Sequence, residues 1–224
     1  MQTEIIQYLE NKYGQEFEVV KDARWDVTGG YFILTARPKE NRRVTFLGYK
    51  NPSGEFWDYY PDELWTVQLN DEIKPLMDQL YPPRNRWEFE LIVFRNDVLK
   101  KQLDEIDPKN IPDYSEVRKQ HPDLTHLDLE MKLAKDVSES NQDEELEKVY
   151  RLIQFFREKG IQDYRIDIDY FEERLLKEKG RDKKEDEGLG DYVTHEIYVT
   201  DKDAETIHSP KDLEKYLEKD PKVY

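Results

Sequence analysis

The sequence contains no cysteine among its 224 residues, and it has only 9 glycines. Without cysteine there are no disulfide bonds, no thiolate nucleophiles and no cysteine-ligated zinc sites. Neither a Gly-x-Gly-x-x-Gly segment nor a Walker-type loop is present, and no serine lies in a Gly-x-Ser-x-Gly turn. These absences exclude several enzyme classes and argue against phosphate binding by a glycine-rich loop.

The sequence also lacks a run of about 18 apolar residues, so it predicts no membrane-spanning helix. Its first residues do not show the basic and then apolar pattern of a signal peptide. We therefore expect a cytoplasmic protein from the sequence as it stands, or an extracytoplasmic lipoprotein if a signal peptide has been trimmed.

Positive charge is in deficit, because 35 Lys and Arg face 51 Asp and Glu, which gives a net charge of −16. An acidic surface argues against nucleic acid as a partner and favours a basic protein or peptide. The high charge does not indicate disorder here, because 15 Tyr, 9 Phe and 4 Trp can bury large areas in a core.

The first half of the chain alternates between helical and extended patterns. Apolar spacing predicts a helix over 3–13 that ends at Gly14, and a helix over 61–80 that is kinked or broken near Pro75. Period-two patterns and turn residues predict strands that begin at Phe17 and that cover 31–36, 44–49, 55–60 and 87–93. A short helix at 96–106 and a proline-rich connection at 107–123 should follow.

The second half carries three alternating segments, 124–134, 162–171 and 191–200, which we expect to form one antiparallel sheet. A helix over 142–159 should cover its apolar face, with Asn141 and Glu144 as a capping box. Ser209 and Pro210 should begin a last helix. Residues 178–188 hold no apolar side chain and predict a mobile charged loop.

Together these elements predict an α+β fold, in which antiparallel sheets are covered by helices. We expect two similar subdomains, an N-terminal one over 1–82 and a C-terminal one over 83–224. The similarity rests on the order of elements, because a helix followed by a strand recurs at 61–94 and at 142–170.

Seven short segments of the chain form a recognisable pattern of caps, turns and apolar stripes: Tyr8–Gly14, Glu16–Val19, Gly30-Tyr31, Ala36–Lys39, Asp58–Tyr60 with Trp65, Glu147–Tyr150 and Lys159–Ile161. Together they resemble an uncharacterised family of small Firmicutes proteins, many of them lipoprotein-like. The likeness covers residues 4 to 218. It implies no catalytic residue, and this sequence lacks a lipobox cysteine.

Asp167 and Asp169 are weak candidates for a metal site, because they share one strand face about 7 Å apart. Asp163 is on the same face, and Asp128 and Glu130 could lie on a neighbouring strand. The alternative is the solvated side of an amphipathic strand, with Arg165 neutralising the acids. We favour this alternative and predict no metal and no cofactor.

The four histidines, His121, His126, His195 and His208, form no zinc-enzyme motif. His195 shares an apolar strand face with Ile197 and Val199, which is typical of a core or edge histidine with a hydrogen-bonded neighbour. A catalytic base would need a partner that spacing does not identify.

The best candidate for a binding site is a stretch rich in aromatic residues, with Trp57, Tyr59, Tyr60 and Trp65 as the candidate binding residues and Tyr49 and Phe56 in the same stretch. On a strand, Phe56 and Asp58 point to one face while Trp57 and Tyr59 point to the other. A single sheet does not easily bury both of its faces, so one of these pairs should be partly exposed. Exposed Trp and Tyr side chains often anchor protein interfaces. The alternative is a strand-to-helix core.

We therefore predict a non-catalytic binding or interaction protein that contacts its partner through this stretch, with acids around it. Two alternatives stay open. One is an acidic immunity-type inhibitor of a basic toxin, and the other is an enzyme with an acid-rich site around Asp167 and Asp169. The oligomeric state does not follow from the sequence.

Overall fold

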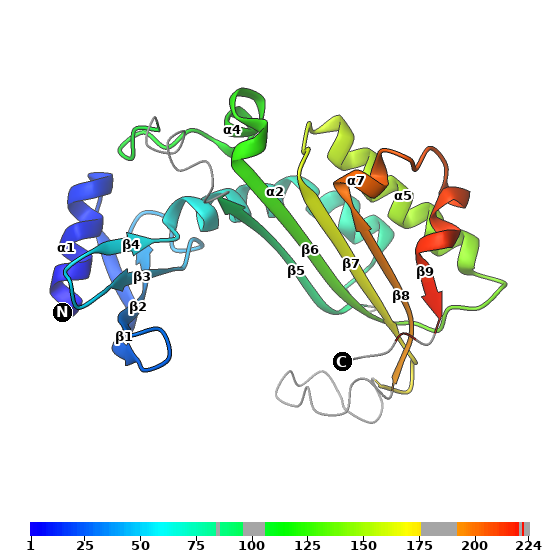
Figure 1. Cartoon of the computed structure of the whole chain (residues 1–224), viewed down its shortest axis with the longest axis horizontal. Coiled ribbons are helices and arrows are strands. Elements are labelled where there is room, and N and C mark those ends of the chain that lie inside the picture. The colour runs from blue at the N-terminus through cyan, green and yellow to red at the C-terminus, as the bar shows by residue number, and fades with distance from the viewer. Residues whose placement is uncertain (84–85, 96–105, 176–191, 220, 222–224) are drawn as a thin grey trace. The chain divides into compact units, whose positions relative to one another are not determined.

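The computed structural model describes residues 1–83, 86–95, 106–175, 192–219 and 221 (Figure 1). The fold is α+β, as predicted, and it divides into two compact units. The N-terminal unit combines Met1–Asp71 with Arg95–Val117, and the C-terminal unit combines Glu72–Phe94 with Arg118–Tyr224. The boundary predicted after residue 82 stays a prediction.

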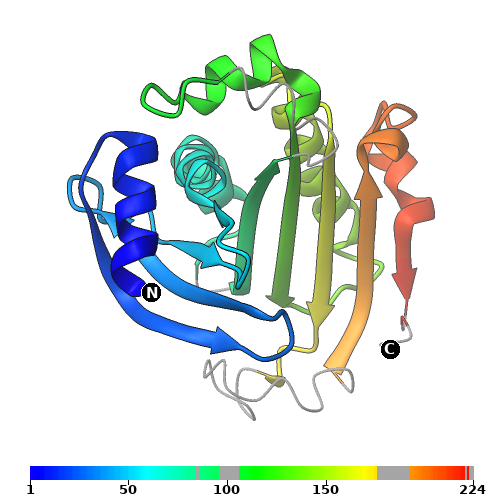
Figure 2. The same cartoon turned by 60° about the vertical axis from the view of Figure 1, so that its left-hand side comes forward.

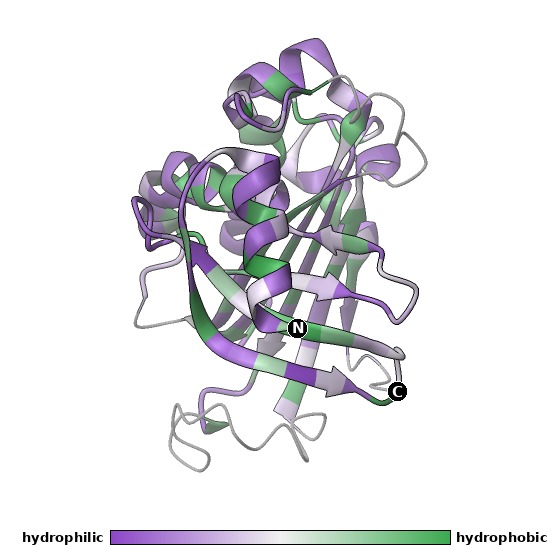
Figure 3. Ribbon diagram, turned by 90° about the vertical axis from the view of Figure 1, so that its left-hand side faces the viewer, coloured by the Kyte–Doolittle hydropathy of each residue, from purple (hydrophilic) through white to green (hydrophobic). Residues whose placement is uncertain are grey.

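In the N-terminal unit, helix α1 (Gln2–Tyr13) precedes four antiparallel strands paired in chain order (Figures 1 and 2). The strands are β1 (Phe17–Asp26), β2 (Tyr31–Pro38), β3 (Phe46–Lys50) and β4 (Phe56–Asp58). The predicted helix and meander are therefore confirmed. Figure 3 shows hydrophobic and hydrophilic residues along α1, which is typical of an amphipathic helix.

Two glycines allow this packing. Gly14 ends α1 with φ at 68°, a left-handed conformation that side chains with a Cβ disfavour. Gly48 lies under α1, and a Cβ there would come within 3.1 Å of the Ile5 side chain. Helix and sheet thus approach closely over a core that contains Ile5, Leu9 and Leu34.

Helix α2 (Tyr60–Leu80) follows β4 and continues through Pro75, so the predicted break does not occur. Its inward stripe of fully buried residues is Trp65, Leu69, Ile73 and Met77. Strand β5 (Arg86–Arg95) comes next, and helix α4 (Tyr114–Gln120) lies inside the segment predicted as a connection. The sequence predicted a loop there because the helix is only two turns long and prolines lie on both sides of it.

The C-terminal unit contains a mixed sheet of strand order β5-β6-β7-β8-β9. Its later strands are β6 (Thr125–Ala134), β7 (Tyr164–Phe171), β8 (Val193–Thr200) and β9 (Leu217–Lys219). Strands β6 and β7 are parallel, so the predicted antiparallel arrangement is wrong for this pair. The reason is that α5 (Gln142–Glu158) connects them as a crossover helix, which returns the chain to the same end of the sheet.

Helix α5 lies along one face of this sheet (Figures 1 and 2), and it buries Leu146, Val149, Leu152, Ile153 and Phe156. The predicted capping box at its start is wrong. The Asn141 side chain instead accepts a hydrogen bond from the Ser138 backbone N–H at 2.8 Å and donates to the Asp136 carbonyl oxygen. It therefore orders the preceding turn rather than the helix end.

The last helix begins as predicted, with Ser209 as its N-cap and Pro210 as its first residue, and it is a 3₁₀ helix over Pro210–Tyr216. A short α7 (Asp201–Ala204), which was not predicted, follows β8. Both sheets pair their strands in chain order, but the first is a four-stranded antiparallel sheet and the second has five strands with a parallel β6–β7 pair, so the predicted similarity of the subdomains does not extend to strand number and direction. The predicted loop at 178–188 and nearly all of the predicted helix at 96–106 lie outside the described residues.

None of the helices in the described ranges combines the length and the apolar character that crossing a bilayer requires.

Candidate functional site

Strand β4 presents its side chains alternately to the two faces of the N-terminal sheet. Trp57 pairs with Tyr49 on β3, and Asp58 pairs with Gly48, which lies under α1. Trp57 therefore lies on the outer face, away from α1 and opposite Asp58, and its separation from Asp58 is the one that the sequence predicted. Tyr59 is on the same face and stays 41% exposed, and its backbone N–H donates to the Leu47 carbonyl oxygen.

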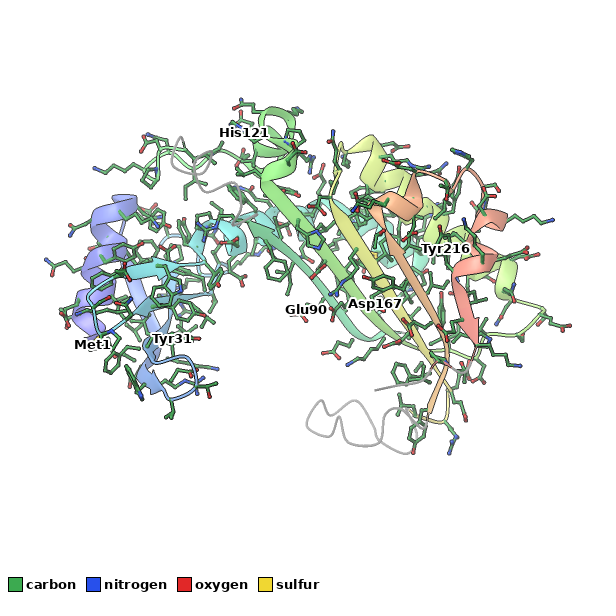
Figure 4. All side chains as sticks on the ribbon, viewed as in Figure 1. Met1, Tyr31, Glu90, His121, Asp167 and Tyr216 are labelled. Carbon is green, nitrogen blue, oxygen red and sulfur yellow. The ribbon has the colours of Figure 1, made fainter. Side chains whose placement is uncertain are left out.

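Four aromatic rings form a continuous cluster on this outer face, and we call it the aromatic cluster: Tyr31, Tyr49, Trp57 and Tyr59. The Tyr49 and Trp57 rings stack with centroids 5.1 Å apart and planes 2° apart. Tyr31 meets both of them edge-on at 5.1 and 5.4 Å, and Tyr59 meets Tyr49 edge-on at 5.6 Å. Figure 4 labels Tyr31, which begins β2. Because each ring contacts another, the cluster is rigid.

The cluster includes Tyr31, which lies outside the predicted aromatic stretch, and Tyr49, which belongs to that stretch but was not among its four candidate binding residues. Tyr31 and Tyr49 come from β2 and β3, and only the strand register brings them beside Trp57. The pKa of Tyr49 is raised to about 12, mainly by burial and to a smaller extent by the neighbouring Tyr59, Tyr31 and Asp26. The Tyr49 hydroxyl is therefore neutral at physiological pH.

A buried carboxylate fixes the orientation of β4. Asp58 is 2% exposed and accepts hydrogen bonds from the hydroxyls of Tyr8 and Tyr13, at 3.0 and 2.6 Å. Lys12 adds an ion pair at 2.8 Å, and the Tyr60 backbone N–H donates at 3.0 Å. Since Asp58 is held under α1, Trp57 and Tyr59 must point to the outer face.

The other two predicted binding residues lie in the interior. Tyr60 is 5% exposed and packs edge-on against Tyr13 and Phe17. Trp65 is fully buried, and its indole N–H donates to the Pro112 carbonyl oxygen at 3.0 Å. They support the unit from within, so the structure brings Trp57 and Tyr59 together but places Tyr60 and Trp65 elsewhere.

Two acids expected around the aromatic stretch are also buried. Asp58 is bound as described, and Asp62 is 4% exposed and pairs with Arg95 at 2.6 Å. Burial has the largest effect and raises the pKa of Asp62, although the charge and hydrogen bonds of Arg95 act to lower it. Negative charge near the aromatic cluster comes from Asp26, which acts on Tyr49 and whose carboxylate also accepts from the Gly29 N–H.

Asp167 and Asp169 lie on the sheet face opposite α5, beside Glu130 and Glu196 on the neighbouring strands. Figure 4 labels Asp167 on β7 and Glu90 on β5. The pKa of each aspartate is raised to about 6, mainly by burial and to a smaller extent by the neighbouring carboxylates. Within the described residues, no group of three or more His, Cys, Asp or Glu side chains is arranged to hold a metal ion.

His126, which was not singled out from the sequence, lies between two carboxylates. Its Nδ1 lies 2.6 Å from Asp163 and its Nε2 lies 2.8 Å from Asp128. Burial lowers the pKa of His126, but the two carboxylates outweigh this and the pKa is raised. Asp128, two residues away on the same strand, was a usable signal, whereas the contact with Asp163 depends on the parallel pairing.

His195 is half-buried on β8, opposite Tyr170, and its Nδ1 lies 3.2 Å from the Thr194 hydroxyl. This position fits the predicted core or edge histidine.

No protein-family model and no curated protein matches the chain. Among solved structures, it is similar to a DUF5037 family protein from Ruminococcus gnavus ATCC 29149, with 14% identity, a TM-score of 0.41 and 89% of each chain covered. That protein belongs to an uncharacterised family and comes from a Firmicute. The lipoprotein-like character implied by the sequence resemblance stays a prediction.

Proposed function

We propose that this chain is a non-catalytic interaction protein that binds a basic protein or peptide through the aromatic cluster. The observation that carries the proposal is the rigid group of four rings on a sheet face, with Tyr59 41% exposed and Leu47 beside it 36% exposed. Tyr and Trp are enriched at interfaces because they bury a large area with few rotatable bonds.

The rings are already ordered before a partner arrives. Tyr49 is only 7% exposed and holds Trp57 by stacking, while buried Asp58 fixes the strand that carries Trp57. Binding would therefore cost little side-chain entropy at these positions, which favours affinity.

The chemistry of the cluster suits a cationic side chain. The faces of Trp and Tyr rings attract Lys and Arg through their quadrupoles. Asp26 lies near Tyr49, where it can add an ion pair, and the net charge of −16 would speed the approach of a basic partner at low salt.

The test is selection from a random peptide library displayed on phage, with the full chain as bait. We expect enrichment of peptides that combine Lys or Arg with an apolar residue. Substitution of Tyr59→Ala should weaken binding of the selected peptides by about tenfold or more, because a partly exposed anchor is lost. Enrichment of acidic peptides, or no enrichment, would contradict the proposal.

Trp25→Ala and Tyr198→Ala are matched controls. Both side chains are 43% exposed, close to Tyr59, but Trp25 pairs with Phe32, on the α1 face of the same sheet, and Tyr198 belongs to the C-terminal unit. Neither change should alter peptide binding. If either control weakens binding as much as Tyr59→Ala, the aromatic cluster is not the binding surface.

A further inference from the structure

The N-terminal unit contains a pocket of about 290 Å³ that shares no residue with the aromatic cluster. Its walls include Tyr13 from α1, Pro61 and Trp65 from α2, and Ile111. This volume is close to the lower end of small-ligand sites, which are mostly apolar with a few polar groups.

The polar groups on the wall are two cations, Lys12 and Arg95. Among the described residues that line the pocket there is no Asp or Glu, although acids outnumber bases in the chain. The carboxylates that neutralise these cations lie behind them, because the side chain of Asp58 is fully buried and that of Asp62 is 6% exposed. The cations keep 30% and 19% of their side-chain surface exposed.

Both cations are held in place and keep donor capacity. Arg95 donates its Nε to Asp62 and one Nη to the Asp58 carbonyl oxygen, and its other Nη has no partner within the described ranges. Lys12 uses two of its three N–H groups, on Tyr8 and Asp58, in the same part of the chain. The described wall of the pocket therefore presents N–H donors to its contents without a competing acceptor carboxylate among them.

The geometry points to a binding site for a small carboxylate with an apolar or aromatic body. The carboxylate would accept hydrogen bonds from Lys12 and Arg95, since charged donors form the stronger hydrogen bonds. The apolar body would lie against Trp65, Tyr13 and Ile111. The N-terminal end of α2, at Pro61, adds a favourable field for a negative charge.

The test uses benzoate as the probe, with benzamide and benzylamine as neutral and cationic analogues of similar shape. The reporter is the indole N–H signal of Trp65 in two-dimensional NMR spectra of the full chain, because this group lies at the pocket wall. We expect a saturable shift with benzoate and none with the two analogues. Equal binding of benzamide, or no saturable shift up to about 10 mM benzoate, would overturn the inference.

Variants at Pro108 separate binding from stability. Pro108 lines the pocket but is exposed and lies in a turn, so its replacement leaves the core intact. Pro108→Glu should weaken benzoate binding by about threefold or more relative to Pro108→Gln, because it adds a negative charge near the site. Equal affinities of these two variants would also overturn the inference.

A second pair of variants tests the cations directly. Lys12→Met should weaken benzoate binding by about tenfold, and Lys12→Arg should keep most of it. Lys50→Met is the control, because Lys50 lies in the same unit, pairs with Glu4 and does not line this pocket. An unchanged affinity in a folded Lys12→Met variant would contradict the assignment.

Discussion

Asp167→Asn should stabilise the protein at pH 8. Asp167 lies on β7 with Glu130 and Tyr198 as its neighbours across the sheet. Its pKa is raised from 3.8 to about 6, mainly by burial and to a smaller extent by the charges of Asp169 and Glu196. At pH 8 the ionised carboxylate therefore disfavours the folded state, and a neutral amide of the same shape removes that cost.

The size of the effect follows from the pKa. A rise from 3.8 to about 6 is about two units, and each unit corresponds to about 1.4 kcal/mol, which sets a ceiling of about 3 kcal/mol. The carboxylate keeps contact with solvent, which screens the charges, so we expect about 1 to 2 kcal/mol. For a chain of this length, that corresponds to a rise in melting temperature of roughly 2–8 °C.

The sign depends on pH. Because the folded pKa of Asp167 is raised, the wild type gains stability as pH falls from above 6 towards 3.8, while the Asn variant gains nothing from this site. The difference in melting temperature should therefore be positive at pH 8 and should vanish near pH 4. Thermal unfolding of both proteins between pH 4 and 8 measures it.

Glu147→Gln is the control, because Glu147 is exposed on α5 and its replacement should leave the melting temperature nearly unchanged at both pH values. A lower melting temperature of Asp167→Asn at pH 8 would refute the reasoning, and so would a difference that does not depend on pH. Either result would mean that a contact made by the ionised carboxylate outweighs its burial.

Three further predictions concern the fold. Asp58→Ala should cost about 3 kcal/mol in urea unfolding, because it leaves Lys12 and the Tyr13 hydroxyl without their buried partner; a loss below about 1 kcal/mol would contradict the role given to Asp58. His126→Gln should lower the free energy of unfolding most below pH 6.5, and this loss should shrink as pH rises through the raised folded pKa of His126. A loss that grows with pH would contradict a raised pKa. Gly14→Ala should lower the free energy of unfolding by about 1 kcal/mol, because φ at this position is 68°. An unchanged midpoint of urea unfolding would contradict this prediction.

Local patterns were sufficient to predict most elements of the fold. The apolar stripe of α1, the turn residues around 51–54 and the alternation in β6 and β7 each have one local interpretation, and each element forms where it was expected. The α+β class follows from their order.

Strand direction was not predictable in the same way. The alternation in β6 and β7 is the same for parallel and antiparallel pairing, because both place every second residue on one face. The crossover helix α5 was itself predicted, and the rule that such a connection joins parallel strands would have corrected the sheet.

The candidate site was predictable only in part. Alternation along β4 correctly separated Trp57 and Tyr59 from Phe56 and Asp58. Trp65 lies four residues before Leu69 on the buried stripe of α2, so helical spacing could have predicted its burial. The contribution of Tyr49 depends on cross-strand register, which local spacing does not give.

The most direct test of the proposed function is the affinity of one selected basic peptide for Trp57→Ala and Trp25→Ala, measured by calorimetry beside the wild type. Trp57 belongs to the aromatic cluster, and Trp25 lies on the other face of the same sheet. We predict that Trp57→Ala weakens binding by at least about tenfold while the protein stays folded, and that Trp25→Ala leaves the affinity unchanged. Equal affinities of the two variants would contradict the proposal that the aromatic cluster is the binding surface.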